Sequence, residues 1–240
     1  MQAKMRNANT RSGFALIVVL SGLTVLTALF AVTSAIMMAR LERSHSTAVL
    51  VGTNRLNHEA LRLVLQGEVP DASAALLQLE LGGATYQITL QDTGGLIDLN
   101  TAAPELIDMV ADHLGLPEEA LDRLRDWRRT PHRLIRTSDF LRVTDASPAL
   151  NSKLEEIATV YSGRRGIAPD VAPQAVLELI SDHGSSREAA LEEIDGEFVS
   201  APSGVNFRVV VQDSKTRAEW IAGTVHLPRT SDNRRVLWLR

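Results

Sequence analysis

The sequence predicts an α+β protein: an N-terminal transmembrane helix continues into a helix-plus-antiparallel-sheet domain, and an all-helical domain interrupts the sheet. Three observations lead to this prediction. Residues 14–39 are 26 consecutive uncharged, mostly apolar residues. Apolar and polar residues alternate at 84–92, which is typical of a strand, and further strand-like segments follow after residue 206. Residues 97–195 between them carry helical spacing. The predicted order is a basic leader (1–13), a transmembrane helix (14–39), a helix and first strand (40–96), a helical insert (97–195) and returning strands (196–240).

The composition excludes some classes of function. The 240 residues carry a formal net charge of −4 and include no cysteine. Disulfides, thiolate metal sites and cysteine catalysis are therefore excluded. The mild acidity argues against nucleic acid as the main partner, because phosphate binding needs a clustered cationic face.

The uncharged run is long enough to cross a membrane. As a helix of 26 residues it would measure about 39 Å, against a hydrocarbon core of about 30 Å. The segment before it carries Lys4, Arg6 and Arg11 and no acid. The positive-inside tendency therefore predicts a single pass with a cytoplasmic N-terminus and residues 40–240 outside. A cleaved signal peptide fits less well, because the run is about twice the usual length.

The segment after the membrane, residues 40–66, predicts a further length of helix. Its apolar stripe would pack on a sheet, and Gly67 and Pro70 would end it. The stripe consists of Val49, Leu56, Ala60, Leu63 and Val64. Strands are expected at 84–92, 206–213, 218–227 and 234–240, with a turn at 93–95.

The helical insert is predicted to contain one unit twice, at an offset of 70 residues. The copies span about 97–165 and 167–195, and Asp112-His113 in the first corresponds to Asp182-His183 in the second. Asn100 and Asp170 stand where a helix N-cap is expected. Each copy is predicted to be a helix, a short turn and a second helix, and stacking the copies would bury their apolar faces.

The stretch RSGFALIVVL at 11–20 resembles the class III signal of type IV pilins and of type II secretion pseudopilins. The resemblance implies that a prepilin peptidase cuts between Gly13 and Phe14 and that Phe14 becomes N-methylated. A glycine before the cut makes physical sense, because a side chain there would crowd the catalytic carboxylates. An ordinary anchor with an accidental Gly-Phe pair is the alternative.

One departure from the usual signal is informative. The family's fifth mature residue is normally a glutamate that offsets the N-terminal charge of a neighbouring subunit, whereas here it is Val18. A subunit with no neighbour above it can dispense with a buried carboxylate. Within the family, the K-type minor pseudopilin at the tip typically lacks this glutamate.

Further segments resemble the K-type pseudopilin in the same order along the chain. They are GGLIDLNTA at 94–102, DWRR at 126–129, TVYSG at 159–163 and VLWLR at the C-terminus. The resemblance implies a pilin-like sheet domain with a helical insert, anchored in the bacterial inner membrane and facing the periplasm. It implies assembly without catalysis, at the tip of the type II secretion pseudopilus. Expected partners are the I-type and J-type minor pseudopilins and the prepilin peptidase, and secreted proteins are a further class that the family allows.

Two alternatives remain open. The insert also resembles the helix-hairpin-helix motif of DNA-binding proteins, which would make the chain a membrane-anchored DNA receptor. A phosphate-binding face would then gather at Arg123, Arg125, Arg128 and Arg129. However, residues 95–165 hold 10 Arg plus Lys against 12 Asp plus Glu, which gives no cationic field. An anchored hydrolase is more distant, since no catalytic motif is present.

Calcium is the one cofactor that the resemblance leaves open. K-type pseudopilins can hold the ion in the sheet domain, where several oxygen ligands must converge from nearby loops. Asp195, Glu197 and Asp213 are the acidic residues in the corresponding region. Their spacing does not by itself indicate a site.

Overall fold

The computed structural model describes residues 9–66, 76–181, 194–228 and 237–239, and the side chains at 9–17, 39–51 and 237–239 are outside the description. The helices are α1 (Asn9–Gln66), α2 (Pro104–Leu114), α3 (Glu118–Arg128), α4 (Thr137–Thr144), α5 (Asn151–Ile157) and α6 (Gln174–Ile180). The strands are β1 (Leu76–Leu81), β2 (Ala84–Asp92), β3 (Ile97–Asp98), β4 (Ala158–Thr159), β5 (Asn206–Asp213), β6 (Glu219–His226) and β7 (Leu237–Leu239). Single turns of 3-10 helix occur at η1 (Thr93–Gly95), η2 (Pro148–Leu150), η3 (Pro169–Val171) and η4 (Gly196–Phe198). The chain divides into two compact units, Met1–Arg55 and Leu56–Arg240.

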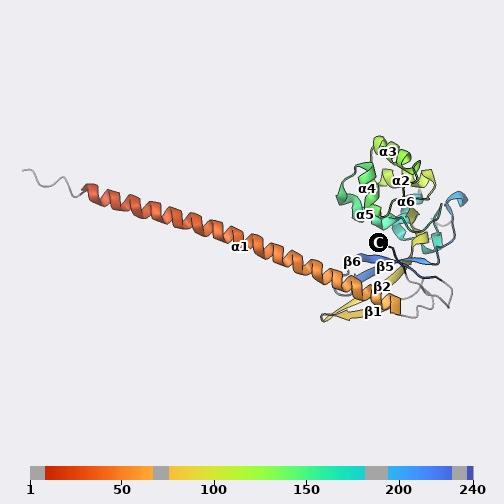
Figure 1. Ribbon diagram of the computed structural model, residues 1–240, viewed down its shortest axis with the longest axis horizontal. Coiled ribbons are helices and arrows are strands. Elements are labelled where there is room, and N and C mark those ends of the chain that lie inside the picture. The colour runs from red at the N-terminus through yellow and green to blue at the C-terminus, as the bar shows by residue number, and fades with distance from the viewer. Residues whose placement is uncertain (1–8, 67–75, 182–193, 229–236, 240) are drawn as a thin grey trace, which may run out of the picture. The chain divides into compact units, whose positions relative to one another are not determined.

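The main sheet has five strands in the order β1-β2-β5-β6-β7, and all its pairs are antiparallel. β1 and β2 form a hairpin whose turn, Gly82-Gly83, has two positive φ angles of 62° and 80°. Glycine suits this turn because other residues adopt such angles at a cost. Figure 1 shows these strands together with the last turns of α1. The protein is therefore α+β, as the sequence predicts.

The predicted strands at 84–92 and 206–213 are confirmed residue for residue by β2 and β5. The strand predicted at 218–227 is two residues shorter, at Glu219–His226. Of the strand predicted at 234–240, Leu237–Leu239 is confirmed, and the rest lies outside the described residues. The sequence analysis did not predict β1 or the short parallel pair β3–β4. β1 reads LLQLEL, and leucine without β-branched neighbours gives only a weak strand signal.

One apolar core lies between α1 and the sheet. Leu56, Ala60 and Val64 recur every four residues along α1 and are buried, together with Leu61. They pack with buried strand residues that include Ile88, Leu90, Val209, Val211 and Val225. The prediction that this part of the helix packs on a sheet is confirmed. Leu63 is only half-buried, and Val49 lies outside the described side chains. Leu61 is buried because it follows the same face at the 3.6-residue period.

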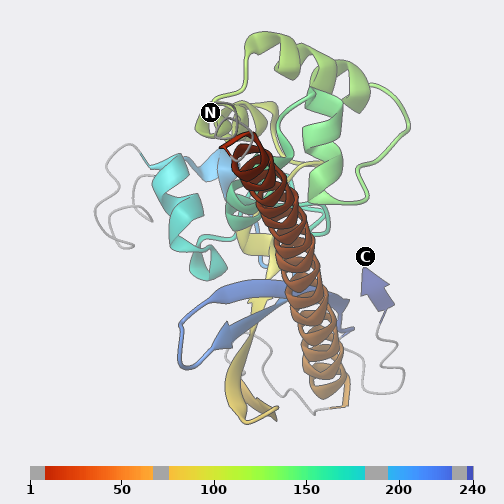
Figure 2. The same cartoon turned by 90° about the vertical axis from the view of Figure 1, so that its left-hand side faces the viewer.

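A second apolar core belongs to the segment between β2 and β5. It runs in sequence from Leu96 to Phe198 and includes the fully buried Phe140, Leu106 and Leu154. Figures 1 and 2 show α2 to α6 gathered in one group beside the strands. The sheet is thus interrupted in sequence by a helical part with its own core.

Within that part, the first predicted turn is confirmed and the predicted caps are wrong. Gly115 ends α2 in the left-handed conformation, with φ 67°. Asn100 is no N-cap, because α2 begins at Pro104 after Ala103. Proline favours the first helical position, so the start moves to it. Asp170 lies in η3, and α6 follows Pro173 instead. The rest of the second copy, 182–193, lies outside the described residues.

Candidate functional site

The predicted cleavage site and anchor lie in the first unit. Gly13 and Phe14 are the fifth and sixth residues of α1, which begins at Asn9. Their side chains are not described. Val18 is 53% exposed and begins a 21-residue stretch, Val18–Met38, that is long and apolar enough to cross a membrane. The structure therefore contains an N-terminal apolar helix that fits a single-pass anchor.

Four hydroxyl groups of the anchor are satisfied within the helix. Four hydroxyls donate hydrogen bonds to carbonyls three or four residues earlier in α1: Ser21 to Val18, Thr24 to Leu20, Thr27 to Leu23 and Thr33 to Leu29, at 2.7–3.1 Å. In hydrocarbon an unpaired hydroxyl costs several kcal/mol, so this pattern suits lipid. The large side chains point outward, with Phe30 73% exposed. Such a surface needs lipid or other protein against it.

At the other end of α1, a polar contact supports the apolar packing on the sheet. Trp220 on β6 donates its indole N–H to Asn57 Oδ1 at 2.9 Å. The Trp220 ring also meets Tyr86 edge-on, with ring centroids 6.1 Å apart. The half-buried indole is stable here because its one donor is satisfied.

Two buried aspartates hold the region where the helical part leaves and rejoins the sheet. Asp92 at the end of β2 accepts hydrogen bonds from the backbone N–H groups of Gly94, Ser203 and Gly204. Asp98 on β3 accepts from Asn100 and Thr101 on one oxygen, and from Ser162 Oγ and the Gly163 N–H on the other. Neither aspartate was among the residues predicted from the sequence. The segments Asp-Thr-Gly-Gly and Ile-Asp-Leu-Asn could have indicated these roles, because an aspartate in a turn commonly accepts hydrogen bonds from backbone N–H groups two or three residues ahead.

Arg208 is a third contact between the sheet and the helical part that sequence reasoning missed. Its side chain leaves β5 and is only 5% exposed. The guanidinium donates to the carbonyls of Glu155 and Ala158 at the end of α5. Burial lowers the pKa of Arg208 to about 10, and the charge of Glu155 partly opposes this. A cation at a helix C-terminus satisfies carbonyls that lack partners within the helix.

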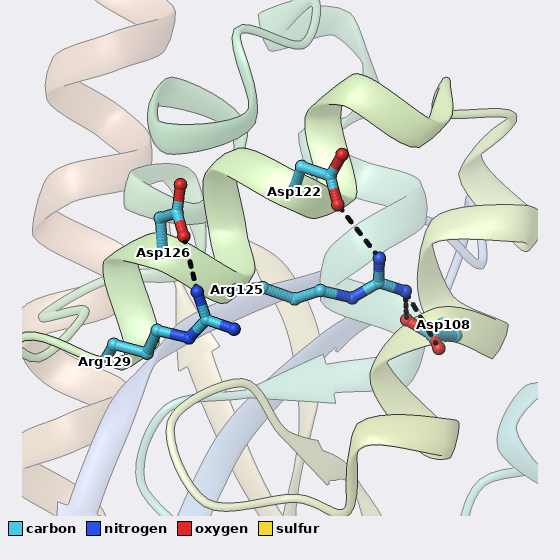
Figure 3. Close-up of polar contacts among 5 residues, drawn as sticks. All are labelled: Asp108, Asp122, Arg125, Asp126 and Arg129. Atoms are coloured by element: carbon cyan, nitrogen blue, oxygen red, sulfur yellow. Dashed lines mark hydrogen bonds and ion pairs between the residues drawn. The ribbon is translucent and has the colours of Figure 1, made fainter.

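The four arginines of the proposed DNA-binding face are engaged within the protein. Arg125 pairs with Asp122 at 3.1 Å and Asp108 at 3.3 Å, and the hydrogen bond to Asp122 raises its pKa (Figure 3). Arg129 pairs with Asp126 at 3.0 Å, as the same view shows. Arg123 and Arg128 donate to the backbone carbonyls of Thr144 and Ala102. The neighbouring carboxylates weaken any attraction for phosphate, so the structure does not favour the DNA alternative.

The three acids considered for calcium do not converge. Asp213 is opposite Tyr86, at one end of the β2–β5 pair. Asp195 and Glu197 belong to the turn at η4, where the carbonyl of Phe198 accepts a hydrogen bond from the Ile167 N–H. The N–H of Ala168, which follows Ile167, donates to the carbonyl of Gly94 just after β2. The η4 turn is therefore near the opposite end of β2 from Asp213. Six strand residues, or about 20 Å, separate these ends. In the described part of the chain, no group of three His, Cys, Asp or Glu side chains could hold a metal ion.

Asp195 and Asp213 instead serve local turns. Asp195 caps η4 by accepting from the Glu197 N–H. Asp213 accepts from the Lys215 and Thr216 N–H groups at 2.8 Å, and these bonds lower its pKa. Both carboxylates therefore have a structural role as hydrogen-bond acceptors in turns.

Comparison with known proteins gives distant likenesses among solved structures only. No protein-family profile and no curated protein matches the chain. Among solved structures, it is similar to a chain of the GspK–GspI–GspJ complex from the enterotoxigenic Escherichia coli type 2 secretion system. The two chains are 13% identical, the match covers 85% of this chain and 97% of that one, and the TM-score is 0.45. Similarity at this level establishes no common function, so the proposal below rests on this chain's own residues.

Proposed function

We propose that this protein is a K-type minor pseudopilin that caps the tip of a type II secretion pseudopilus in the bacterial inner membrane. It acts by assembly with I-type and J-type minor pseudopilins and catalyses no reaction. The observation that carries the proposal is the order of parts around α1. A basic leader ending at Gly13 precedes the apolar segment, and the last turns of the same helix pack on an antiparallel sheet.

Two further features support the tip position. Val18 provides no carboxylate at the fifth position after the proposed cut, so it cannot offset the amine of a subunit above. The helical part between β2 and β5 adds bulk that a closely stacked filament shaft would have to accommodate. A subunit at the end of a filament has free space for it.

Leader processing tests the family proposal. Co-expression with a prepilin peptidase should remove residues 1–13 and leave an N-methylated Phe14, as read by mass spectrometry of the mature N-terminus. Because Gly13 and Phe14 are the fifth and sixth residues of α1, the first two turns must unwind for the peptidase to hold the bond extended. Gly13→Leu should block cleavage while the protein stays in the membrane fraction.

Gly22→Leu is the matched control. It makes the same substitution in the same helix, where a Cβ added at residue 22 would meet nothing within 4 Å beyond the adjacent backbone of α1. Processing should be unchanged in this variant. A mature N-terminus at Arg40 or Leu41 would instead identify a cleaved signal peptide and refute the pseudopilin proposal.

A further inference from the structure

A pocket opens between α3 and α4 in the helical part of the molecule. Its volume is about 520 Å³, within the usual range of ligand sites. It is lined by Arg123, Asp126, Trp127, Thr130, Arg142 and Val143. The leader, the anchor and the tip position make no use of it.

Two arginines and one acid line the pocket, and Arg142 is ion-paired with Asp139 at 3.0 Å. Asp126 is its one acid, and Arg129 offsets that charge at 3.0 Å. Arg123 donates one described hydrogen bond, to the Thr144 carbonyl, and Arg142 donates one, to Asp139 Oδ1 at 3.0 Å. A guanidinium has five N–H donors, so each arginine keeps several for a ligand. Two guanidinium groups beside one pocket favour a carboxylate.

The remaining wall is apolar and contains an unsatisfied donor. Trp127 and Val143 supply the apolar surface. The indole N–H of Trp127 is enclosed and has no acceptor within the described part of the chain. The exposed imidazole of His132 lies against the same ring, with centroids 5.4 Å apart. An enclosed donor without an acceptor costs free energy, so a ligand carbonyl that reached this N–H would be favourable.

We propose that this pocket binds a peptide segment of another protein, by a carboxylate on Arg123 and Arg142 and an adjacent apolar side chain on Trp127 and Val143. This inference goes beyond the proposed function and does not depend on it. A nucleic acid fits less well. Asp122, Asp126 and Asp139 flank the two arginines and would repel a chain of phosphates, whereas one carboxylate needs only the two guanidinium groups.

The tryptophan indole signals provide a direct test. The chain has three tryptophans, Trp127, Trp220 and Trp238, so the ¹⁵N-labelled full chain in non-ionic detergent should give three indole N–H signals. Trp127→Phe identifies its own. The probe is a short acetylated and amidated peptide with one aspartate followed by one leucine in a glycine–serine background. It should shift the Trp127 signal in a saturable way and leave that of Trp220 unchanged.

Three changes define the ligand. Replacing the aspartate of the peptide by asparagine should weaken binding about tenfold or more, because a charge-assisted pair is lost. The double variant Arg123→Gln with Arg142→Gln should weaken it similarly. Arg125→Gln removes the same charge from α3 at a residue paired with Asp108 and Asp122, and should leave the affinity unchanged.

Other outcomes would overturn the proposal. These are an unshifted Trp127 signal at millimolar peptide, equal binding of the asparagine peptide, or a preference for duplex DNA or inorganic phosphate. A Trp127 shift that depends on protein concentration without peptide would make a second copy of the chain the occupant. If the double variant disturbs the Trp220 signal, the asparagine peptide on the unchanged protein decides the question.

Discussion

Asp92 Oδ1 accepts a 2.9 Å hydrogen bond from the backbone N–H of Ser203, 111 residues later in the sequence. The same carboxylate accepts from the N–H groups of Gly94 and Gly204, each at 2.7 Å. One side chain thereby joins the chain leaving β2 to the chain about to enter β5. The helical part is held at the two points where it departs from the sheet and returns.

Asp92→Asn should lower the free energy of unfolding by about 2 kcal/mol, because a charged acceptor is lost and the new amide N–H₂ group faces a backbone donor. Urea unfolding of the full chain in detergent, followed by tryptophan fluorescence, would measure the loss. Glu80→Gln on the exposed side of β1 is the control and should change stability by less than about 0.5 kcal/mol. Equal effects of the two substitutions would show that the Asp92 contacts contribute little.

His113, in the last turn of α2, should make stability depend on pH. Burial, and then the charge of Lys153, lower the pKa of His113 from 6.5, while Glu156 acts in the opposite direction. The imidazole of the unfolded chain therefore binds a proton more readily than that of the folded chain. The stability that the neutral His113 contributes is present above pH 6.5 and is lost as the pH falls through the lower pKa of the folded protein. His113→Gln should lose less stability than the unchanged protein as pH falls from about 7 to about 5.

Lys153→Gln separates the two causes. It removes the charge of Lys153 and leaves the burial, so the pKa of His113 measured by NMR titration should rise toward 6.5. An unchanged midpoint would mean that burial alone sets the shift.

The full chain in detergent should bind duplex DNA no better than a neutral control protein at near-physiological salt. The arginines of α3 are paired with aspartates or donate to backbone carbonyls, which leaves no cationic field. Filter binding over a salt series would measure this. Submicromolar, steeply salt-dependent binding that disappears in Arg123→Ala, Arg125→Ala and Arg128→Ala would favour the DNA receptor instead.

A tag on the helical part should label isolated pseudopili at one end only, as seen by immunogold electron microscopy. Val18→Glu alone should not move the label into the shaft, because the bulk between β2 and β5 still opposes stacking. Deleting residues 97–194 together with Val18→Glu should permit partial incorporation along the filament. Labels spaced along the whole filament in the unchanged protein would refute the tip position.

The sequence by itself determined the parts that depend on local pattern. The uncharged run from Phe14 to Ala39 predicts a membrane helix because length and apolarity are sufficient for that property. Alternation of apolar and polar residues predicts β2 to the residue, because one face of that strand packs on the core. The predicted bounds of β5 are also exact, although its central residues are buried on both faces. Gly115 marks a helix end because the left-handed conformation there suits glycine. The processing site at Gly13 and Phe14 stays a prediction that only chemistry can test.

The tertiary structure decided which polar groups meet across long stretches of sequence. Arg208 reaches the end of α5, and Asn100 hydrogen-bonds the backbone N–H and carbonyl of Leu134 instead of capping a helix. Neither pairing has a local signal, because the partners are 50 and 34 residues apart. The same holds for the arginines of α3: charge counts suggest a near balance, but only the fold shows that Asp108 lies beside Arg125. Contacts of this kind depend on how β2 and β5 are joined through the helical part, which no short window of sequence encodes.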